Sequence, residues 1–348
     1  MKVMVLREIT RLEVNKSPLE LTDLPVPIPN DREILVKVSV CGVCHTELDE
    51  IEGRTSPPKF PIIPGHQIVG RVEKTGSKAS RFNIGDRVGI AWIHSACGRC
   101  EYCRGGMENL CGDFKATGRD AQGGYGEFTT VPEGFAYAIP QPFTDAEAAP
   151  LLCAGAIGYR SLRLANMHDR GNIGLTGFGA SAHLVLKMVK HLYPNAGIFI
   201  FSRTEQERVF ARELGAQWAG DTSDSPPEKL HAIIDTTPVW KPVVEAMKHL
   251  VRGGRLVINA IRKEESDKEA LLTLDYSRDL WMEKEMKSVA NITRRDVEEF
   301  LPLAAEMRIR PEIEEYPLEQ ANRALLELKE RKIRGAKVLS VSGSKGER

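Results

Sequence analysis

The chain has 348 residues, and its 48 basic and 48 acidic side chains leave no net charge. A neutral chain without a basic tract matches neither nucleic acid nor an acidic membrane surface, so we expect no partner of either kind. Apolar runs are too short to cross a bilayer, and a hydrophobic content of 42% is typical of a globular protein in water. This length usually exceeds a single core, which favours more than one domain.

Residues 1–150 have the pattern of short strands separated by turns. Between the strands, prolines gather in stretches that favour irregular loops. Alternating apolar residues bounded by turn residues predict strands at Met1–Arg7, Glu33–Val40, Gln67–Lys74 and Arg87–Ala91. We therefore expect a β-rich, barrel-like first domain.

From about residue 145 the pattern changes to alternating helices and strands. Asp145–Ala165 is helical in character, and strands and helices then alternate as far as Ala260. This alternation predicts a parallel, doubly wound sheet, so the fold class is α/β. We place the second domain at residues 151–285. Residues 286–348 form a C-terminal segment that we assign to the first domain, although periodicity alone does not show that return.

Four cysteines lie close together in the first domain, with the spacing C-x2-C-x2-C-x7-C. They are Cys97, Cys100, Cys103 and Cys111. One loop of this spacing can surround a single ion, and thiolates are the ligands of closed, structural zinc sites. Two disulfides would require a secreted protein, whereas the opening MKVMVLREIT is unlike a signal peptide. We expect a cytoplasmic protein with a structural zinc lobe at about residues 94–113, an iron–sulfur cluster being the alternative.

A glycine-rich turn joins the expected strand Gly171–Thr176 to a helix. It matches the dinucleotide fingerprint G-x-G-x-x-G/A and consists of Gly177, Phe178, Gly179, Ala180, Ser181 and Ala182. The first glycine permits a tight turn, and the second lets a pyrophosphate approach the free N–H groups of the helix. The alanine at the third position allows close packing of helix on strand. We therefore expect this turn to bind a dinucleotide.

The following strand usually ends in an acid that holds the ribose 2′-hydroxyl of NAD. Here Ser202, Arg203 and Thr204 stand at that place, about twenty residues after the fingerprint. They offer no carboxylate to repel a 2′-phosphate, and Arg203 can form a charge-assisted bond to one. NADP(H) is therefore favoured over NAD(H). The alternative is that Arg203 only stacks on the adenine.

Three further soft ligands stand beside turns, namely Cys44, His66 and Cys153. Two cysteines and one histidine leave the fourth position of a zinc ion open, as in catalytic zinc sites. Spacing alone makes this a weak grouping, since a buried cysteine is usually an inert small hydrophobe. Cys41 to His45 also match the C-x-x-C-H haem motif, which we reject because haem attachment requires export. A redox role for Cys41 and Cys44 is less easily excluded.

Taken together, these motifs resemble the zinc-containing alcohol dehydrogenases of the medium-chain dehydrogenase/reductase superfamily, over essentially the whole chain. Besides the cysteine quartet, the resemblance is carried by Cys41–Leu48, Pro64–His66, Gly85–Val88, Gly123–Glu127 and Leu151–Tyr159. It implies a GroES-like catalytic domain, a Rossmann cofactor domain and an active site in the cleft between them. It also implies that Cys44, rather than Cys41, binds the catalytic zinc with His66 and Cys153.

The resemblance further implies roles for the residues next to this zinc. Thr46 would hydrogen-bond the substrate oxygen and pass its proton outward, and His45 would lie near the cofactor phosphates or in that relay. Zinc would act as a Lewis acid while hydride moves between the carbinol carbon and the nicotinamide. Trp92 and Ile93 are candidates for the wall of the substrate pocket, and ordinary core packing explains them almost equally well.

The chain also departs from the usual family pattern. Gln67 follows the ligand histidine where a glutamate is usual, which makes the surroundings of the metal less negative. Asp49 stands where some members end the proton relay with a histidine. Near the C-terminus, Ala336 replaces the usual arginine for the cofactor pyrophosphate, with Arg334 as a candidate substitute.

We therefore expect a zinc-dependent alcohol dehydrogenase or aldehyde reductase that prefers NADP(H) and holds two Zn²⁺ per chain. Its substrate would be a small-molecule alcohol or aldehyde. Because similar enzymes are dimers or tetramers, we expect a homodimer or homotetramer. The alternatives are a polyol or sugar dehydrogenase of the same fold, and a non-catalytic NADP-binding redox sensor. A zinc-free quinone reductase is disfavoured, since it would lack the ligand set.

Overall fold

A computed structural model describes residues 1–330 and 335–341, except for the side chain of Ala180. The chain divides into two compact units. The first comprises Met1–Cys153 together with the described residues from Thr293 onward, and the second comprises Ala154–Ile292. Within the described parts of the chain, every helix is too short or too polar to cross a bilayer.

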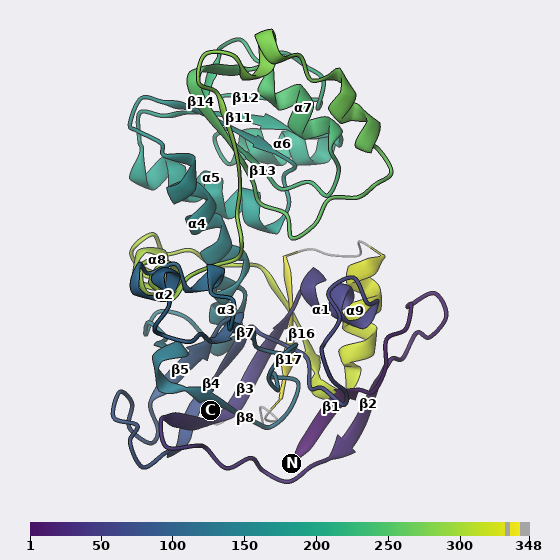
Figure 1. The fold of residues 1–348 in the computed structure, drawn as a ribbon, viewed down its shortest axis with the longest axis vertical. Coiled ribbons are helices and arrows are strands. Elements are labelled where there is room, and N and C mark those ends of the chain that lie inside the picture. The colour runs from purple at the N-terminus through teal and green to yellow at the C-terminus, as the bar shows by residue number, and fades with distance from the viewer. Residues whose placement is uncertain (331–334, 342–348) are drawn as a thin grey trace. The chain divides into compact units, whose positions relative to one another are not determined.

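The first unit is built on a seven-stranded sheet (Figure 1). Its strands, in spatial order, are β16 (Ile313–Pro317), β17 (Ala336–Ser340), β3 (Glu33–Val43), β4 (Ile68–Thr75), β5 (Arg87–Ile90) and β9 (Ala136–Ala138), with β8 (Phe128–Pro132) paired to β3. Two small antiparallel pairs accompany it: β1 (Lys2–Leu6) with β2 (Leu19–Asp23), and β6 (Ile93–Ser95) with β7 (Lys115–Ala116). The C-terminal strand β17 pairs antiparallel with β3, which shows how the end of the chain joins this unit.

The helices of the first unit are short. They are α1 (His45–Ile51), α2 (Glu101–Arg104), α3 (Asp145–Ala148), α8 (Arg294–Glu306) and α9 (Ala321–Lys329), with 3₁₀ turns at Glu108–Leu110, Glu133–Phe135, Ala149–Leu152 and Leu318–Gln320. The core lies along β3, most of whose residues are buried, and it includes Tyr125 and apolar residues of β4 and α9. This apolar packing is the main source of stability for the unit.

The predicted helical stretch Asp145–Ala165 is not continuous. Helix α3 passes into a 3₁₀ turn that contains Pro150, and the chain breaks at Cys153 (φ −126°, ψ −79°) before α4 (Ala154–Ala165) begins. Proline has no backbone N–H to donate to a helix, which favours such an interruption. The break therefore holds Cys153 outside regular helix.

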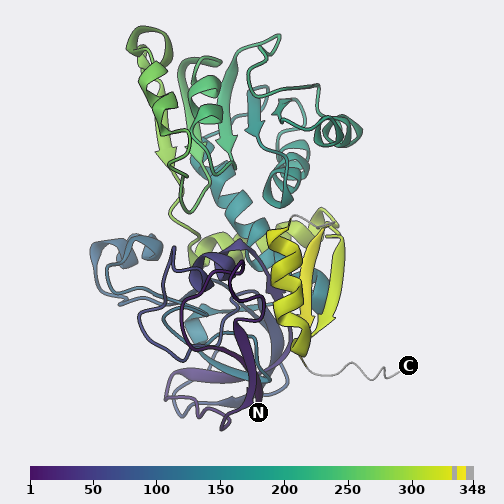
Figure 2. The same cartoon turned by 90° about the vertical axis from the view of Figure 1, so that its right-hand side faces the viewer.

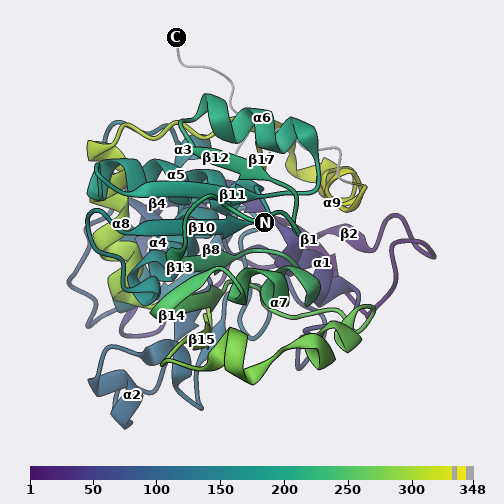
Figure 3. The ribbon, with the colours of Figure 1, turned by 90° about the horizontal axis from the view of Figure 1, so that it is seen from above.

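The second unit contains a six-stranded parallel sheet, and Figure 3 shows its strands in their spatial order. They are β12 (Trp218–Gly220), β11 (Gly197–Phe201), β10 (Asn172–Thr176), β13 (Leu230–Asp235), β14 (Leu250–Ile258) and β15 (Glu285–Ser288). Because crossovers between parallel strands are right-handed, α5 (Ala180–Leu192) and α6 (Glu205–Glu213) lie on one face and α7 (Lys241–Met247) on the other (Figure 2).

Strand order reverses between β10 and β13. Rossmann-type sheets have such a reversal, and they bind dinucleotides there, at the carboxyl ends of the strands. The short strands β12 and β15 were not predicted from the sequence. The pattern of residues 243–250 predicts a helix, but the helix ends at Met247 and Leu250 begins β14. Turns of 3₁₀ type at Lys268–Thr273 and of π type at Tyr276–Leu280 separate β14 from β15.

Candidate functional site

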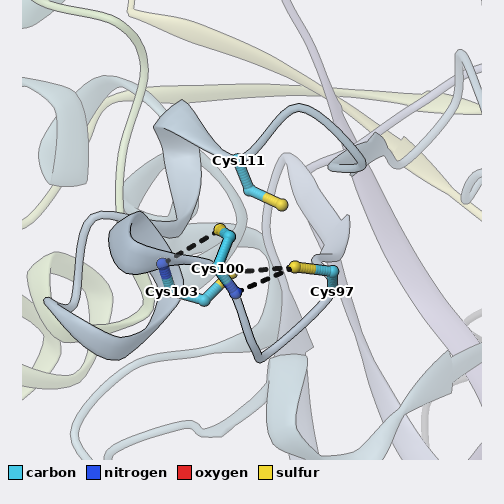
Figure 4. Close-up of side chains that lie close together, drawn as sticks. All are labelled: Cys97, Cys100, Cys103 and Cys111. Atoms are coloured by element: carbon cyan, nitrogen blue, oxygen red, sulfur yellow. Dashed lines mark hydrogen bonds between the residues drawn. The ribbon is translucent and has the colours of Figure 1, made fainter.

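The structure gathers the four closely spaced cysteines of the first unit around one point (Figure 4). All four sulfur atoms, from Cys97, Cys100, Cys103 and Cys111, lie within 4.8 Å of one another. The Sγ atoms of Cys97 and Cys103 are 3.9 Å apart. Four sulfurs at the usual zinc–sulfur distance would be about 3.8 Å apart in a tetrahedron, so the cluster has the dimensions of a closed zinc site.

Backbone N–H groups point at these sulfurs. The amide of Cys100 donates to Cys97 Sγ and that of Cys103 donates to Cys100 Sγ, each at 3.4 Å. Donation from the amides of Arg99 and Cys100 lowers the pKa of Cys97 to about 6, because hydrogen bonds to a thiolate stabilise its charge. Thiolates supported in this way suit a structural metal ion.

A second group of ligand atoms comes from three distant parts of the same unit. Cys44 precedes α1, His66 lies in the loop before β4, and Cys153 stands at the break before α4. Their ligand atoms also lie within 4.8 Å of one another, and Cys44 Sγ is 3.6 Å from His66 Nε2. A sulfur and an imidazole nitrogen that share a tetrahedral zinc would be about 3.5 Å apart. These residues fit a zinc ion that keeps one open position.

Glu47 orients this second group, and the sequence analysis gave it no role. Its Oε1 lies 2.6 Å from His66 Nδ1, and its Oε2 accepts the Cys44 N–H at 2.8 Å. Both side chains are buried, with 1% exposure for His66 and none for Glu47. The carboxylate therefore favours a proton on Nδ1 and leaves the Nε2 lone pair facing the sulfurs. The spacing Cys44-x-x-Glu47, which has the form of a capping box, was the available signal.

The protonation of this group depends on its buried charges. A hydrogen bond with Cys153, burial and the charge of Glu47 all raise the pKa of Cys44 well above its usual value. Burial alone would lower the pKa of His66, but the charges of Glu47 and Cys44 raise it. A divalent ion would reverse this balance, since a coordinated thiol loses its proton. The ligand set therefore fits zinc chemically as well as in its dimensions.

Cys41 is not part of either cluster. It is fully buried, and an added side-chain carbon at Gly65 or Gly124 would lie within 2.9 Å of its sulfur. Its Sγ donates to the Gly42 carbonyl at 3.6 Å, and burial raises its pKa. These contacts favour a packing role for Cys41.

The remaining predicted residues near the second group differ in their surroundings. Thr46 is half-buried, and its backbone N–H donates to Cys44 Sγ at 3.4 Å, whereas His45 is exposed. Asp49 forms an ion pair with Arg54. The carboxylate of Asp49, which stands where a proton relay could end, is therefore already paired with Arg54.

Gln67 is 3% exposed and lies directly against Gly42. Its carbonyl accepts the Gly42 N–H at 2.9 Å, and a side-chain carbon at Gly42 would lie 2.8 Å from the Gln67 amide carbon. The Nε2 of Gln67 is buried without a hydrogen-bond partner among the described residues. An amide is thus held tightly in the place where a carboxylate is usual.

Trp92 and Ile93 belong to the core of the first unit. Trp92 packs on Phe114 at 5.2 Å between ring centroids and beneath the guanidinium of Arg119 at 5.7 Å. Ile93 is 2% exposed and pairs with Ala116. These contacts agree with the packing alternative, and a role in a substrate pocket stays a prediction.

The dinucleotide fingerprint has the geometry that its sequence predicts. Gly177 has φ +76°, and a side-chain carbon there would lie 2.9 Å from Thr236 Oγ1. Gly179 caps α5 without a side-chain hydrogen bond, and no atom of the described structure lies within 4 Å of the position where its side chain would begin. Ala182 is fully buried. The helix N-terminus is therefore open to an anion.

The other fingerprint residues have supporting positions. Phe178 is buried and packs edge-on against Phe210, with 5.8 Å between ring centroids, and Ser181 is half-buried. Ala180 begins α5, but its side chain lies outside the described structure, as does the whole of Arg334.

The end of β11 presents one free cation. The guanidinium of Arg203 makes no hydrogen bond or ion pair with any residue that the structure describes, whereas Thr204 caps α6 by accepting the Glu207 N–H at 3.3 Å. The Glu207 carboxylate in turn accepts a short hydrogen bond from Ser202 Oγ. Sequence analysis did not identify Glu207, because the residue lies in the helix that follows the strand end.

Comparison with known proteins is consistent with this architecture. Residues 30–141 match the family described as the alcohol dehydrogenase GroES-like domain. The chain is 43% identical over 333 residues to a probable alcohol dehydrogenase of Mycobacterium tuberculosis, covering 94% of each protein. It is 31% identical over 335 residues to an alcohol dehydrogenase of Geobacillus stearothermophilus, covering 94% of this chain and 96% of the other.

A solved structure shows the same likeness in three dimensions. The cinnamyl alcohol dehydrogenase SbCAD4 of Sorghum bicolor superposes with a TM-score of 0.82 at 25% identity, and the match covers 100% of both chains. The extent of these matches, together with the GroES-like and Rossmann-type units, shows that the chain belongs to the zinc-containing medium-chain alcohol dehydrogenase family.

Proposed function

We propose that this protein is a zinc-dependent alcohol dehydrogenase or aldehyde reductase that holds two zinc ions and prefers NADP(H). The observation that carries the proposal is the convergence of Cys44, His66 and Cys153, with Glu47 behind the histidine. Three ligands with an open fourth position suit catalysis, whereas the four-cysteine cluster is closed and suits a structural role.

The residues of this site would divide the chemistry between them. Zinc, when bound, supplies a Lewis acid that polarises a substrate oxygen. Thr46 is the second residue of α1, two positions after Cys44, so its hydroxyl can take the proton of an alcohol and pass it toward solvent. Glu47 keeps His66 in one tautomer and one orientation. A nicotinamide cofactor held at the fingerprint would exchange hydride with the substrate carbon.

The proposal predicts the effect of removing one ligand. Cys153→Ser should lower the zinc content from about two ions per chain to about one and reduce turnover at least about 100-fold, because the Lewis acid is lost. Zinc content and alcohol oxidation over a panel of alcohols and aldehydes provide the measurements. Cys41→Ser is the matched control, since Cys41 lies outside both clusters. Equal turnover in Cys153→Ser and wild type would contradict the proposal.

A second prediction concerns Glu47. Glu47→Gln should weaken zinc at the second group roughly 10- to 100-fold, because the amide cannot hold a protonated Nδ1 as a carboxylate does. Competition with a chromogenic chelator measures this loss, with the zinc of the cysteine quartet as internal reference. Glu50→Gln is the control, since Glu50 lies on the same helix, is 1% exposed, and has no hydrogen-bond partner for either oxygen among the described residues. Equal losses in the two variants would show that Glu47 has no specific part in zinc binding.

The preference for NADP(H) rests on the end of β11. Arg203 offers a guanidinium without a partner among the described residues, next to the place where the ribose 2′ position of a dinucleotide should lie. Glu207 lies one helical turn further on, and its negative charge would repel a phosphate. Its carboxylate, however, accepts a hydrogen bond from Ser202. The cation is available and the carboxylate is engaged, so the balance favours a 2′-phosphate.

This balance gives a third prediction. Arg203→Ala should weaken NADPH binding about tenfold, as expected for one charge-assisted hydrogen bond, and should change NADH binding less than about twofold. Glu207→Gln should strengthen NADPH binding several-fold. Quenching of protein fluorescence gives both dissociation constants. The preference would be refuted by a wild-type protein that binds NADH as tightly as NADPH.

We also propose that the protein forms a homodimer through β15. This strand ends the parallel sheet, all four of its residues are exposed, and only β14 pairs with it among the described strands. Met286 on β15 and the neighbouring Trp281 add exposed apolar surface, with 37% and 55% exposure. An uncovered edge strand with apolar side chains readily pairs with a second copy of itself.

The fourth prediction tests this edge. Met286→Glu should convert a dimer, or a tetramer built from dimers, to a smaller species, because a charge on each copy would be brought face to face. Light scattering after gel filtration gives the mass. Leu272→Glu is the control, because Leu272 is 87% exposed in the same unit but lies off the strand. A monomeric wild type, or an unchanged mass in Met286→Glu, would refute assembly through β15.

A further inference from the structure

A buried lysine joins the two loops that follow β13 and β14. Its side chain is 8% exposed, and its Nζ donates to Asp235 Oδ2 at 2.5 Å, to the Thr237 carbonyl at 2.7 Å and to the Val239 carbonyl at 2.9 Å. This lysine is Lys263, in the loop after β14, and its three acceptors belong to the end of β13 and the loop that follows. An ammonium group has three protons, so every donor of Lys263 has an acceptor.

Asp235 is equally well satisfied. It is fully buried at the end of β13, and besides Lys263 it accepts hydrogen bonds from Thr176 Oγ1 at 2.5 Å and Thr237 Oγ1 at 2.7 Å. A charged pair removed from water is costly unless all its hydrogen bonds are made, and here the ion pair has them. Such a pair is weak evidence for added stability, and its bonds to both loops suit it to fixing their local shape.

The ion pair continues directly into the dinucleotide fingerprint. Thr176 is the last residue of β10, and its carbonyl accepts both the N–H and the Oγ1–H of Thr236, at 3.0 and 2.9 Å. Thr236 Oγ1 is also the atom closest to the missing side chain of Gly177. The loop that Lys263 fixes therefore forms one wall of the tight turn at Gly177.

Three further hydrogen bonds fasten the same loops together. The Glu264 N–H donates to the Pro238 carbonyl at 2.7 Å, and Asp267 accepts the N–H groups of Trp240 and Lys241 at the start of α7. These loops lie where the strand order reverses between β10 and β13, which is where the two halves of a dinucleotide meet. Lys263 is the charged link at the centre of these contacts.

We propose that the Lys263–Asp235 ion pair is a positioning device for the pyrophosphate and nicotinamide half of the cofactor, which holds the β13 and β14 loops in the shape that the Gly177 turn needs. The inference rests on the proposed function, because it assumes a dinucleotide at the fingerprint. It adds a determinant of cofactor affinity whose lysine lies more than eighty residues from the fingerprint in sequence, and which does not itself contact the adenosine end at β11.

The test compares whole and partial ligands. Lys263→Met should raise the dissociation constant of NADPH at least about tenfold, because the loop after β13 loses its charged link to the β14 loop, while adenosine 2′,5′-bisphosphate should bind within about twofold of wild type. Binding is measured by fluorescence and calorimetry on the full chain. Lys268→Met is the matched control: Lys268 pairs with Glu265, and its side chain is 58% exposed. It should leave both ligands unaffected.

A second variant guards against misfolding. Removing both charges, in Asp235→Asn with Lys263→Met, avoids an unpaired buried carboxylate, and near-ultraviolet circular dichroism checks the fold. The double variant should show the same selective loss of NADPH. Wild-type affinity for NADPH in the folded variants, or equal losses for NADPH and the bisphosphate, would overturn the positioning role alone. A wild-type protein that binds neither NADPH nor NADH would instead refute the proposed function, and the positioning role with it.

Discussion

The site in the first unit depends on one buried carboxylate. Glu47 contacts the backbone of Cys44 through one oxygen and the ring of His66 through the other, so a single side chain sets the position of two ligands. The Glu47 carboxylate in turn needs these two partners, because a buried charge without partners is costly. Cys153 supplies the third ligand from the break between the 3₁₀ turn and α4. A continuous helix there would give its side chain another direction. The arrangement concentrates thiols and one negative charge in a space that suits a divalent cation.

The second unit shows the same principle in a different form. Its cofactor turn is shaped by glycines, but the wall against which Gly177 lies is held by a fully bonded ion pair from two later loops. In both units, therefore, a buried charge in direct contact with its partners fixes the groups that chemistry needs. The fold is that of the zinc-containing alcohol dehydrogenase family, and these buried charges set the positions of the ligands and the shape of the cofactor turn in this chain.

Local patterns were readable from the sequence, and contacts between distant residues were not. The cysteine quartet and the glycine fingerprint each lie within one short stretch, so spacing alone pointed to their chemistry. Cys44, His66 and Cys153 are spread over 110 residues, and the family resemblance, rather than spacing, brought them together. Glu47 and Lys263 escaped notice because a charged residue becomes informative only when its burial and partners are known. Strand β15 was missed for a related reason, since an exposed edge strand has no alternating apolar pattern.

The central claim is that the chain holds two chemically different zinc ions. X-ray absorption at the zinc edge, combined with metal content, tests it most directly on the intact protein. Four cysteines in one cluster, and two with a histidine in the other, predict two zinc ions per chain with three sulfur ligands each on average and imidazole scattering from half of the ions. A single zinc with four sulfur ligands and no imidazole would contradict the account, because the group formed by Cys44, His66 and Cys153 would then hold no metal.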